Sequence, residues 1–146
     1  MNNTQHRMIR VNGINMHIAE QGIGPLILLC HGFHETSYSW RHQLRDLAAA
    51  GFHVVAPDMR GYGKTDSPDE IESFNVCEIV ADIVGLLDAL GEEKAIIVGN
   101  DWGATVAWQA ALRQPQRFRG VVALGVPMMQ RSPVAPSSFF PKAAEE

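Results

Sequence analysis

The chain has 146 residues, of which 46% are hydrophobic and 19% are charged. This length suits one domain, and the composition excludes a disordered chain, which would be poorer in apolar residues and more highly charged. The formal net charge is -4, from 12 Lys and Arg against 16 Asp and Glu, and the basic residues do not cluster, which excludes a basic nucleic-acid-binding face.

The predicted elements begin with a β-hairpin. Apolar runs at Met8–Val11 and Ile14–Glu20 flank Asn12-Gly13, the dipeptide most typical of a two-residue hairpin turn. The third predicted strand, Leu26–Cys30, is apolar at every position. Such a run is typical of a parallel strand that helices cover on both faces.

Three predicted helices alternate with the remaining strands. The first has apolar residues at i, i+4, i+7 and i+8 from Trp40 and ends before Gly51. The second spans Val76–Leu90 and starts with a capping box at Asn75. The third spans about Gly103–Gln114 and is rich in alanine. The strands between and after these helices are predicted at Phe52–Ala56, Ala95–Val98 and Gly120–Leu124.

This alternation predicts an α/β fold with a mostly parallel sheet, covered on both faces and preceded by an antiparallel hairpin. The patterned part of the chain ends near residue 126. Residues 127–146 hold Pro127, Pro133, Pro136 and Pro141 and show no periodic pattern. We therefore expect one domain over 1–126, followed by a proline-rich segment over 127–146.

The sequence also argues against a membrane protein. Its apolar runs are much shorter than the roughly 20 residues that span a bilayer, and its first residues lack the pattern of a signal peptide. Cys30 and Cys77 cannot form a disulfide framework, and neither lies in a metal-binding spacing. We expect a cytoplasmic protein.

The most informative stretch is Val98-Gly99-Asn100-Asp101-Trp102-Gly103, which joins a predicted strand to a predicted helix. This is the context of a nucleophile elbow, whose sharp turn needs small residues such as Gly99 and Gly103. Asp101 stands where serine hydrolases have Ser. A carboxylate is ionised at neutral pH, since its reference pKa is about 3.9, and its attack on a saturated carbon gives an ester that water can hydrolyse. The alternative is an Asp that only caps the helix.

A second motif, His31-Gly32-Phe33, follows the third strand, where hydrolases of this fold donate an oxyanion-hole amide. We predict that the backbone N–H groups of Phe33 and Trp102 form the oxyanion hole. His31 is expected to be structural, hydrogen-bonded beneath the loop. His31 and His34 could suggest a metal pair, but no third ligand motif accompanies them, so no metal is predicted.

The sequence Gly61-Tyr62-Gly63 predicts a tight loop after the fourth strand. A phosphate-binding loop is not indicated, because Asp66 replaces the third glycine of G-x-G-x-x-G. We expect Asp58 and Arg60 to form an ion pair that fixes this loop. The aromatic residues expected to pack rather than to bind ligands are Trp40, Tyr62 and Trp108.

Four motifs together resemble epoxide hydrolases of the α/β-hydrolase fold, in the branch with an Asp nucleophile. These motifs are His31-Gly32-Phe33, 37–43, 56–63 and 99–103, and the resemblance runs from about Val11 to Val126. It implies that Asp101 opens a small apolar epoxide and that a His-activated water hydrolyses the ester to a vicinal diol, without a cofactor. Phe33 favours this family over the haloalkane dehalogenases, which typically carry Asn at this position.

The chain departs from the family pattern in two ways. His34 replaces a proline, and all six histidines precede Asp101, whereas the family's acid and base follow the nucleophile. We therefore expect the N-terminal half of a hydrolase, with 127–146 leading toward a missing lid domain and the rest supplied by a second chain or the missing C-terminal half. Alone, the chain is expected to be alkylated once without turnover. The alternatives are a haloalkane dehalogenase using Asp101 and a non-catalytic binding module of the same fold.

Overall fold

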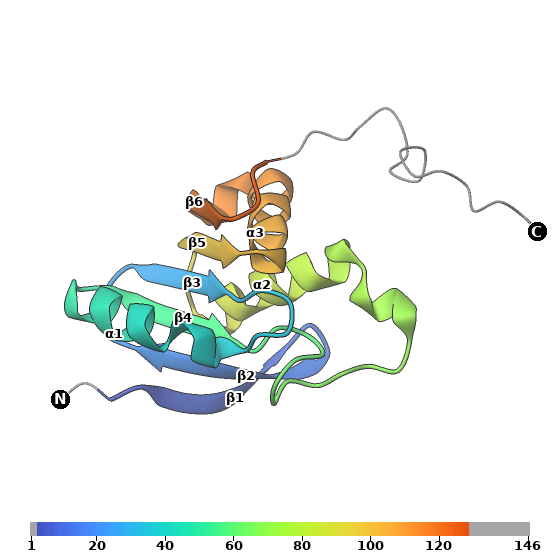
Figure 1. Ribbon diagram of the computed structural model, residues 1–146, viewed down its shortest axis with the longest axis horizontal. Helices are drawn as coiled ribbons and strands as arrows, with labels where there is room; N and C mark the ends of the chain where they lie inside the picture. Colours follow the sequence, from blue (N-terminus) through green and yellow to red (C-terminus); the bar gives the residue numbers. More distant parts are fainter. Residues whose placement is uncertain (1–2, 129–146) are drawn as a thin grey trace, which may run out of the picture.

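Strands and helices alternate along residues 3–128, the part of the chain that the computed structural model describes (Figure 1). The strands are β1 (Gln5–Val11), β2 (Ile14–Gln21), β3 (Leu26–Cys30), β4 (His53–Pro57), β5 (Ala95–Asn100) and β6 (Phe118–Leu124). The α-helices are α1 (Arg41–Ala49), α2 (Val76–Leu90) and α3 (Trp102–Arg113), with short 3-10 turns at Ser37–Trp40, Ile71–Phe74 and Pro115–Arg117. All predicted elements are present, with ends shifted by a few residues.

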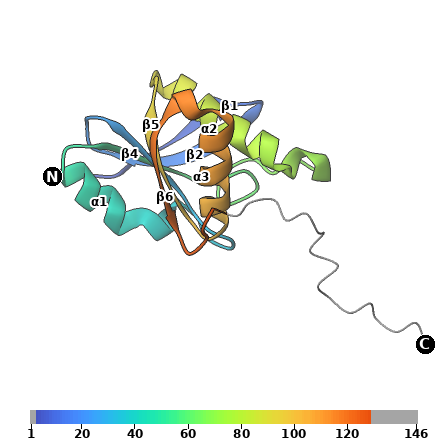
Figure 2. The same cartoon turned by 90° about the horizontal axis from the view of Figure 1, so that it is seen from above.

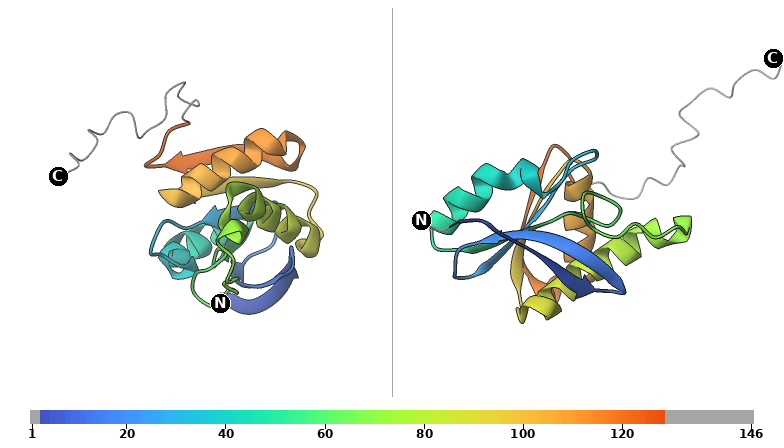
Figure 3. Two further views of the ribbon diagram at one scale, coloured as in Figure 1. Left: turned by 90° about the vertical axis from the view of Figure 1, so that its right-hand side faces the viewer. Right: turned by 90° about the horizontal axis from the view of Figure 1, so that it is seen from below.

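The strands form one sheet in the order β1-β2-β4-β3-β5-β6. β1 pairs antiparallel with β2, and β2 pairs antiparallel with β4. The pairs β3–β4, β3–β5 and β5–β6 are parallel. The predicted α/β fold with a leading antiparallel hairpin is therefore confirmed. Figure 3 shows the hairpin and β6 at opposite edges of the sheet.

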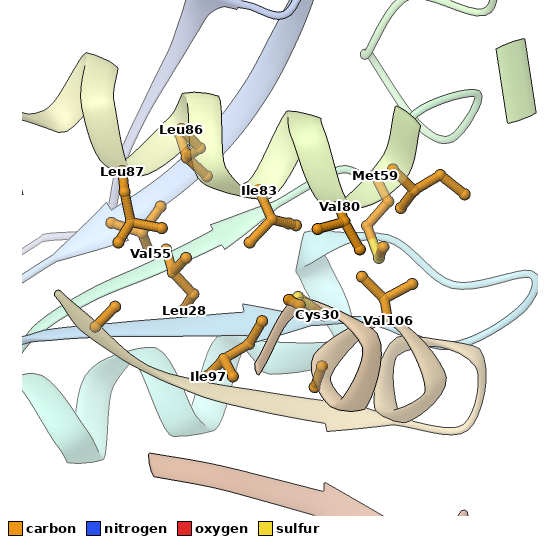
Figure 4. Close-up of a cluster of buried hydrophobic side chains, with 14 of the residues drawn as sticks. Leu28, Cys30, Val55, Met59, Val80, Ile83, Leu86, Leu87, Ile97 and Val106 are labelled. Atoms are coloured by element: carbon orange, nitrogen blue, oxygen red, sulfur yellow. The ribbon is translucent and has the colours of Figure 1, made fainter. Parts of the chain in front are cut away.

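Helices cover the sheet from both sides. Seen from above, α1 lies on one face, and α2 and α3 lie on the other (Figure 2). The larger core packs α2 and α3 against the sheet, and Figure 4 shows Ile83 and Leu87 of α2 facing Leu28 and Ile97. The smaller core packs Leu44 and its neighbours on α1 against the other face. All five residues of β3 are buried, as expected for a parallel strand between two helical layers.

The outer part of the sheet is less covered. On β6, Val122 is 47% exposed and Leu124 is 44% exposed. Their β5 neighbours on the same face, Val98 and Asn100, are half-buried. This face lies on the side of α1, which packs against β4 and β2 instead.

The ends of α2 follow its sequence. The side-chain oxygen of Asn75 accepts hydrogen bonds from the N–H groups of Cys77 and Glu78, at 2.9 and 3.1 Å. Gly91, with φ 73°, follows the last turn in the left-handed conformation that favours glycine. The reciprocal half of the predicted capping box is not seen, because the Glu78 carboxylate accepts from the Asn12 amide at 3.1 Å.

The predicted Asp58–Arg60 ion pair is wrong. Arg60 donates to both carboxylate oxygens of Asp82 on α2, at 2.7 and 2.6 Å. Asp58 binds His17 Nδ1 at 2.9 Å and accepts from the N–H of Ser37 at 2.8 Å. Arg60 and Asp58 are thus each paired with a residue of another element. The partner of Arg60 lies on α2, so the sequence of the loop alone does not reveal it.

Trp40 is buried against α1 and Tyr62 packs on the larger core, so the packing part of the aromatic predictions is confirmed for these two residues. That neither ring binds a ligand stays a prediction. The indole N–H of Trp108 donates to the Val126 carbonyl at 3.1 Å. No helix in the described part of the chain has the length and apolar character needed to cross a bilayer. Most of the predicted proline-rich segment 127–146 lies outside the described residues.

Candidate active site

Asp101 occupies the tight turn between β5 and α3. Its backbone has φ 53° and ψ -118°, a conformation that non-glycine residues adopt only where the surroundings impose it. Two hydrogen bonds impose it here. The Asp101 N–H donates to the carbonyl of Leu124 on β6 at 3.0 Å, and the Asp101 carbonyl accepts from Ala104 at 3.0 Å. The side chain makes no helix-capping bond and is exposed.

The two predicted elbow glycines are required by close backbone contacts. A Cβ on Gly99 would overlap the carbonyl oxygen of Gly103. A Cβ on Gly103 would overlap the carbonyl of Cys30 at the end of β3. The spacing Gly-x-Asp-x-Gly therefore lets α3 start directly against β3 and β5, which brings the elbow beside the loop that follows β3.

The structure brings the three predicted site residues together. The Phe33 N–H donates to Oδ2 of Asp101 at 3.0 Å. The pKa of the Asp101 carboxyl lies below its ordinary value because the N–H groups of Phe33 and of Trp102 both donate to it. These amides favour the ionised form, which is the nucleophilic form of a carboxylate. The same two donors would face an oxyanion that develops at this position.

The loop that carries Phe33 is fixed at both ends. The Gly32 N–H donates to the Glu35 carboxylate at 2.7 Å, and the Ser37 N–H donates to Asp58. Burial alone would raise the pKa of Asp58, but hydrogen bonds from the amides of Lys64 and Ser37 outweigh it and lower the pKa. Sequence reasoning missed the roles of Glu35 and Asp58, because a lone acidic residue in a loop gives no signal of the amide it binds.

His31 supports this loop from below. It is 1% exposed, and its Nε2 accepts from the Met59 N–H at 2.9 Å. Its Nδ1 lies 2.9 Å from the Gly32 carbonyl, to which it donates as the neutral tautomer. The prediction of a structural His31 is therefore confirmed. Within residues 3–128, no group of three or more His, Cys, Asp or Glu side chains could hold a metal ion.

His31 makes the stability of this chain sensitive to acid. Burial lowers the pKa of His31 below its ordinary value, so the unfolded chain takes up a proton at a higher pH than the folded chain. Its contribution to stability is complete above about pH 6.5 and is lost as the pH falls below that value. Between pH 7 and pH 5, we expect the free energy of unfolding to fall by less in His31→Gln than in the unmodified chain. Urea denaturation at each pH measures this difference.

The matched control is His42→Gln, which removes an exposed histidine of α1. This variant is expected to keep the pH dependence of the unmodified chain. Equal slopes for the unmodified chain and His31→Gln would contradict the assignment of His31 as a neutral buried acceptor.

A cavity of about 300 Å³ opens beside the elbow. It is lined by Phe33, Met59, Arg60, Tyr62, Phe74, Ile79 and Trp102. Phe33 and Trp102, which line this cavity, also carry the two amides that hold Asp101, but Asp101 itself is not a lining residue. The sequence offered no signal for Phe74, which comes from the turn before α2, and it indicated for Ile79 only that this residue lies in the predicted helix Val76–Leu90.

Comparisons with known proteins identify the family of the chain. The sequence model of the alpha/beta hydrolase fold matches residues 25–145. Over 136 residues the chain is 50% identical to epoxide hydrolase 3 of Siraitia grosvenorii, covering 93% of this chain and 43% of that protein. It is 46% identical over 136 residues to epoxide hydrolase A of Mycobacterium tuberculosis, covering 92% and 42%.

Solved structures give the same picture. The crystal structure of an epoxide hydrolase from Vigna radiata superposes with a TM-score of 0.90 at 47% identity, over 93% of this chain and 44% of that one. Epoxide hydrolase A from Mycobacterium thermoresistibile gives 0.91 at 45% identity, over 94% and 44%. The chain spans less than half the length of these relatives, as predicted for part of a hydrolase. It belongs to the alpha/beta hydrolase fold family and is similar to the epoxide hydrolases within it.

Proposed function

We propose that this chain carries the nucleophile of an epoxide hydrolase, an enzyme that converts a small apolar epoxide and water into a vicinal diol. One observation carries the proposal: the N–H of Phe33 holds an exposed Asp101 carboxylate at 3.0 Å on a strained turn. The identity of 46–50% to proteins named epoxide hydrolases supports it.

The first step forms an ester. One carboxylate oxygen of Asp101 attacks an epoxide carbon from the side opposite the ring oxygen. The carbon–oxygen bond of the ring breaks, and its electron pair goes to the ring oxygen, which takes a proton from an acid or from water. Since Phe33 holds Oδ2, Oδ1 is the attacking atom, and Oδ2 becomes the carbonyl oxygen of the ester.

The second step hydrolyses the ester. A base takes a proton from a water molecule as the water oxygen adds to the carboxyl carbon of Asp101, and the negative charge develops on Oδ2. The N–H groups of Phe33 and Trp102 stabilise this charge, as preorganised amides do in acyl transfer. The bond between the carboxyl carbon and Oδ1 then breaks. Oδ1 leaves as a hydroxyl oxygen of the diol and takes the proton back from the base, and the carboxylate is regenerated with the water oxygen in place of Oδ1. No organic cofactor or metal takes part in this proposal.

The base for this second step is expected outside the 146 residues, since every histidine of the chain precedes Asp101. We propose that 1–126 form the N-terminal part of the hydrolase core and that 127–146 lead toward a lid domain. The missing C-terminal half or a second chain would then supply the base. We also propose a cytoplasmic location, because the two cysteines are free thiols, which reducing compartments maintain.

Covalent labelling tests the proposal. The 146-residue chain is incubated with styrene oxide, and its intact mass is followed over time. We expect one adduct per chain, mapped by peptide sequencing to Asp101, with little diol released. Labelling at other residues alone, or no labelling, would contradict the proposal, and the latter would favour a binding module.

A parallel incubation with haloalkanes separates the epoxide hydrolase from the dehalogenase. Both enzyme classes would use Asp101, but Phe33 offers no side-chain donor for a halide ion. We expect styrene oxide to label the chain faster than a primary haloalkane of similar size. Faster halide release than epoxide labelling would favour the dehalogenase.

A further inference from the structure

β6 is an edge strand whose outer side has no strand beside it in the described part of the chain. Within residues 3–128 it pairs with β5 alone, and Figure 1 shows it at one margin of the sheet. Residues Gly120–Leu124 pair one-to-one with Ile96–Asn100, after an irregularity at the start of the strand. Such an edge presents a row of main-chain N–H and C=O groups that can pair with another strand.

The two edges of the sheet differ in how well they are protected. β1, at the opposite edge, carries His6, Arg7 and Arg10. Charged side chains on an edge strand discourage pairing with another chain. β6 has Arg119 as its only charged residue and contains no proline, and its other residues are apolar apart from one glycine. β6 is therefore the edge that favours association.

The hydrogen bond to Asp101 shows which main-chain groups of β6 face outward. The Leu124 carbonyl accepts from the Asp101 N–H at 3.0 Å, so the main-chain groups of Leu124 point toward β5. Successive residues of a strand direct these groups to opposite sides. Val121 and Ala123 therefore present theirs at the free edge, where a partner strand would pair with them.

The side chains of β6 form a patch that is complementary to itself. Val122 and Leu124 are 47% and 44% exposed, on the side of the sheet that carries α1. Gly120 lies on the same side, because side chains alternate along a strand. A Cβ on Gly120 would meet nothing within 4 Å, so the space above it is open. An antiparallel copy of the strand, centred on Val122, would set Leu124 opposite this open space.

We propose that the free edge of β6 binds a second copy of the chain across a twofold axis that passes through Val122. Val121 then exchanges main-chain hydrogen bonds with the partner's Ala123, and Leu124 lies over the partner's Gly120. The two sheets become one continuous sheet. Both copies use the same patch, so the contact closes at a dimer instead of growing into a filament.

The sequence favours a second copy over the end of this chain as the occupant. Proline lacks the N–H that a paired strand donates, and residues 127–146 hold Pro127, Pro133, Pro136 and Pro141. The charges also suit a second copy, because Arg119 lies beyond the partner's Leu124 in this register and no like charges are opposed. Five residues from each copy fall short of the roughly 20–30 in a stable interface, so we expect a weak, reversible dimer.

Sedimentation equilibrium of the 146-residue chain tests the proposal. The weight-average mass should rise from that of a monomer toward that of a dimer between micromolar and millimolar concentrations. A monomer at every concentration would overturn the proposal and leave the edge to a different polypeptide, such as the half of a hydrolase that this chain lacks. Species larger than a dimer would overturn the closed twofold contact.

Amide hydrogen exchange, followed by NMR, locates the contact. The protection of the Val121 and Ala123 amides should rise with the same concentrations as the mass. Protection that does not depend on concentration would mean that residues 129–146 cover β6, which would overturn the proposal. A dimer that leaves these two amides unprotected would place the contact elsewhere and would overturn it as well.

Val122→Lys is expected to abolish the rise in mass, because it sets two like charges directly opposite each other across the twofold axis. Val122 is half-exposed, so the monomer should remain folded, as judged by circular dichroism. The matched control is Met8→Lys, since Met8 on β1 is 49% exposed and lies at the other edge. This control should dimerise like the unmodified chain. Equal loss of the dimer in both variants would overturn the proposal.

Ala123→Pro keeps the proposal testable if Val122→Lys unfolds. Proline is tolerated on an edge strand where its missing N–H would face outward, so the pairing of β5 with β6 should remain. The dimer should be lost, because the partner's main chain loses a donor. A folded Ala123→Pro variant that still dimerises would overturn the proposal.

A disulfide tests the register in a Cys77→Ser background, which removes the exposed native thiol. Val122→Cys should form a disulfide between copies under mild oxidation, because directly opposed Cα atoms lie within disulfide reach. Leu124→Cys should not, because its two copies are about 13 Å apart along the strands. Cross-linking of Leu124→Cys without that of Val122→Cys would overturn the proposed contact.

Discussion

Asp101→Asn should reduce labelling by styrene oxide to less than about one-thousandth of that of the unmodified chain, as removal of a nucleophile does in other hydrolases. An amide carries no negative charge and does not form the ester. The fold should persist, because Asn tolerates the positive φ of this position and its oxygen can still accept from Phe33. Intact mass measures the labelling, and urea denaturation should give an unchanged free energy of unfolding.

The matched control is Asp69→Asn, which changes an exposed carboxylate to its amide outside the site. This variant should be labelled like the unmodified chain. Peptide mapping must also show that the amide introduced at position 101 has not deamidated. Undiminished labelling of intact Asp101→Asn would place the nucleophile elsewhere.

Asp82→Ala should lower the free energy of unfolding by about 3–5 kcal/mol, the range expected when one partner of a buried ion pair is removed. The side chains of Asp82 and Arg60 are 1% and 4% exposed, and Asp82→Ala would leave the buried guanidinium with only the Glu78 carboxylate, 3.9 Å away, as a charged partner. Asp82 also accepts from the Asn12 amide at 2.9 Å, which connects α2 to the hairpin turn. Urea denaturation monitored by circular dichroism measures the loss.

Two comparisons identify the cause of this loss. The double variant Arg60→Met with Asp82→Leu should recover most of the stability, because replacement of a whole buried pair by apolar residues is often neutral or stabilising. Asp88→Ala breaks the Arg117–Asp88 pair, in which Asp88 is 64% exposed, and should cost less than about 1 kcal/mol. Equal losses for Asp82→Ala and Asp88→Ala would show that burial does not determine how much each ion pair contributes to the free energy of unfolding.

Local features of the fold were predictable because short stretches of sequence determine them. Asn12 and Gly13 both adopt positive φ, as the hairpin dipeptide predicts. β3 and α2 have the predicted bounds. β3 follows from an unbroken apolar run, and the start of α2 follows from its N-cap, Asn75. The elbow was predictable for the same reason, since Gly99 and Gly103 flank Asp101 in one continuous segment.

Contacts between distant segments were not predictable from spacing. Arg60 and Asp82 are 22 residues apart, and Asp58 reaches back 41 residues to His17. Nothing in the sequence near Asp58 indicates that its partners are a histidine of β2 and the amide of Ser37. The ring of Phe74 reaches the cavity only because the fold brings Gly61 beside it. The roles of these residues depend on tertiary packing, so only the structure reveals them.

The hydrogen bond from the Asp101 amide to the Leu124 carbonyl makes the position of Asp101 depend on β6, an edge strand of the described sheet. In residues 3–128, β6 pairs with β5 alone, and its far side offers free main-chain groups to any polypeptide that extends the sheet. Such a neighbour would restrain Leu124 and, through it, the orientation of the carboxylate. The reactivity of Asp101 would then depend on a polypeptide that pairs with β6, even though that polypeptide makes no contact with the substrate.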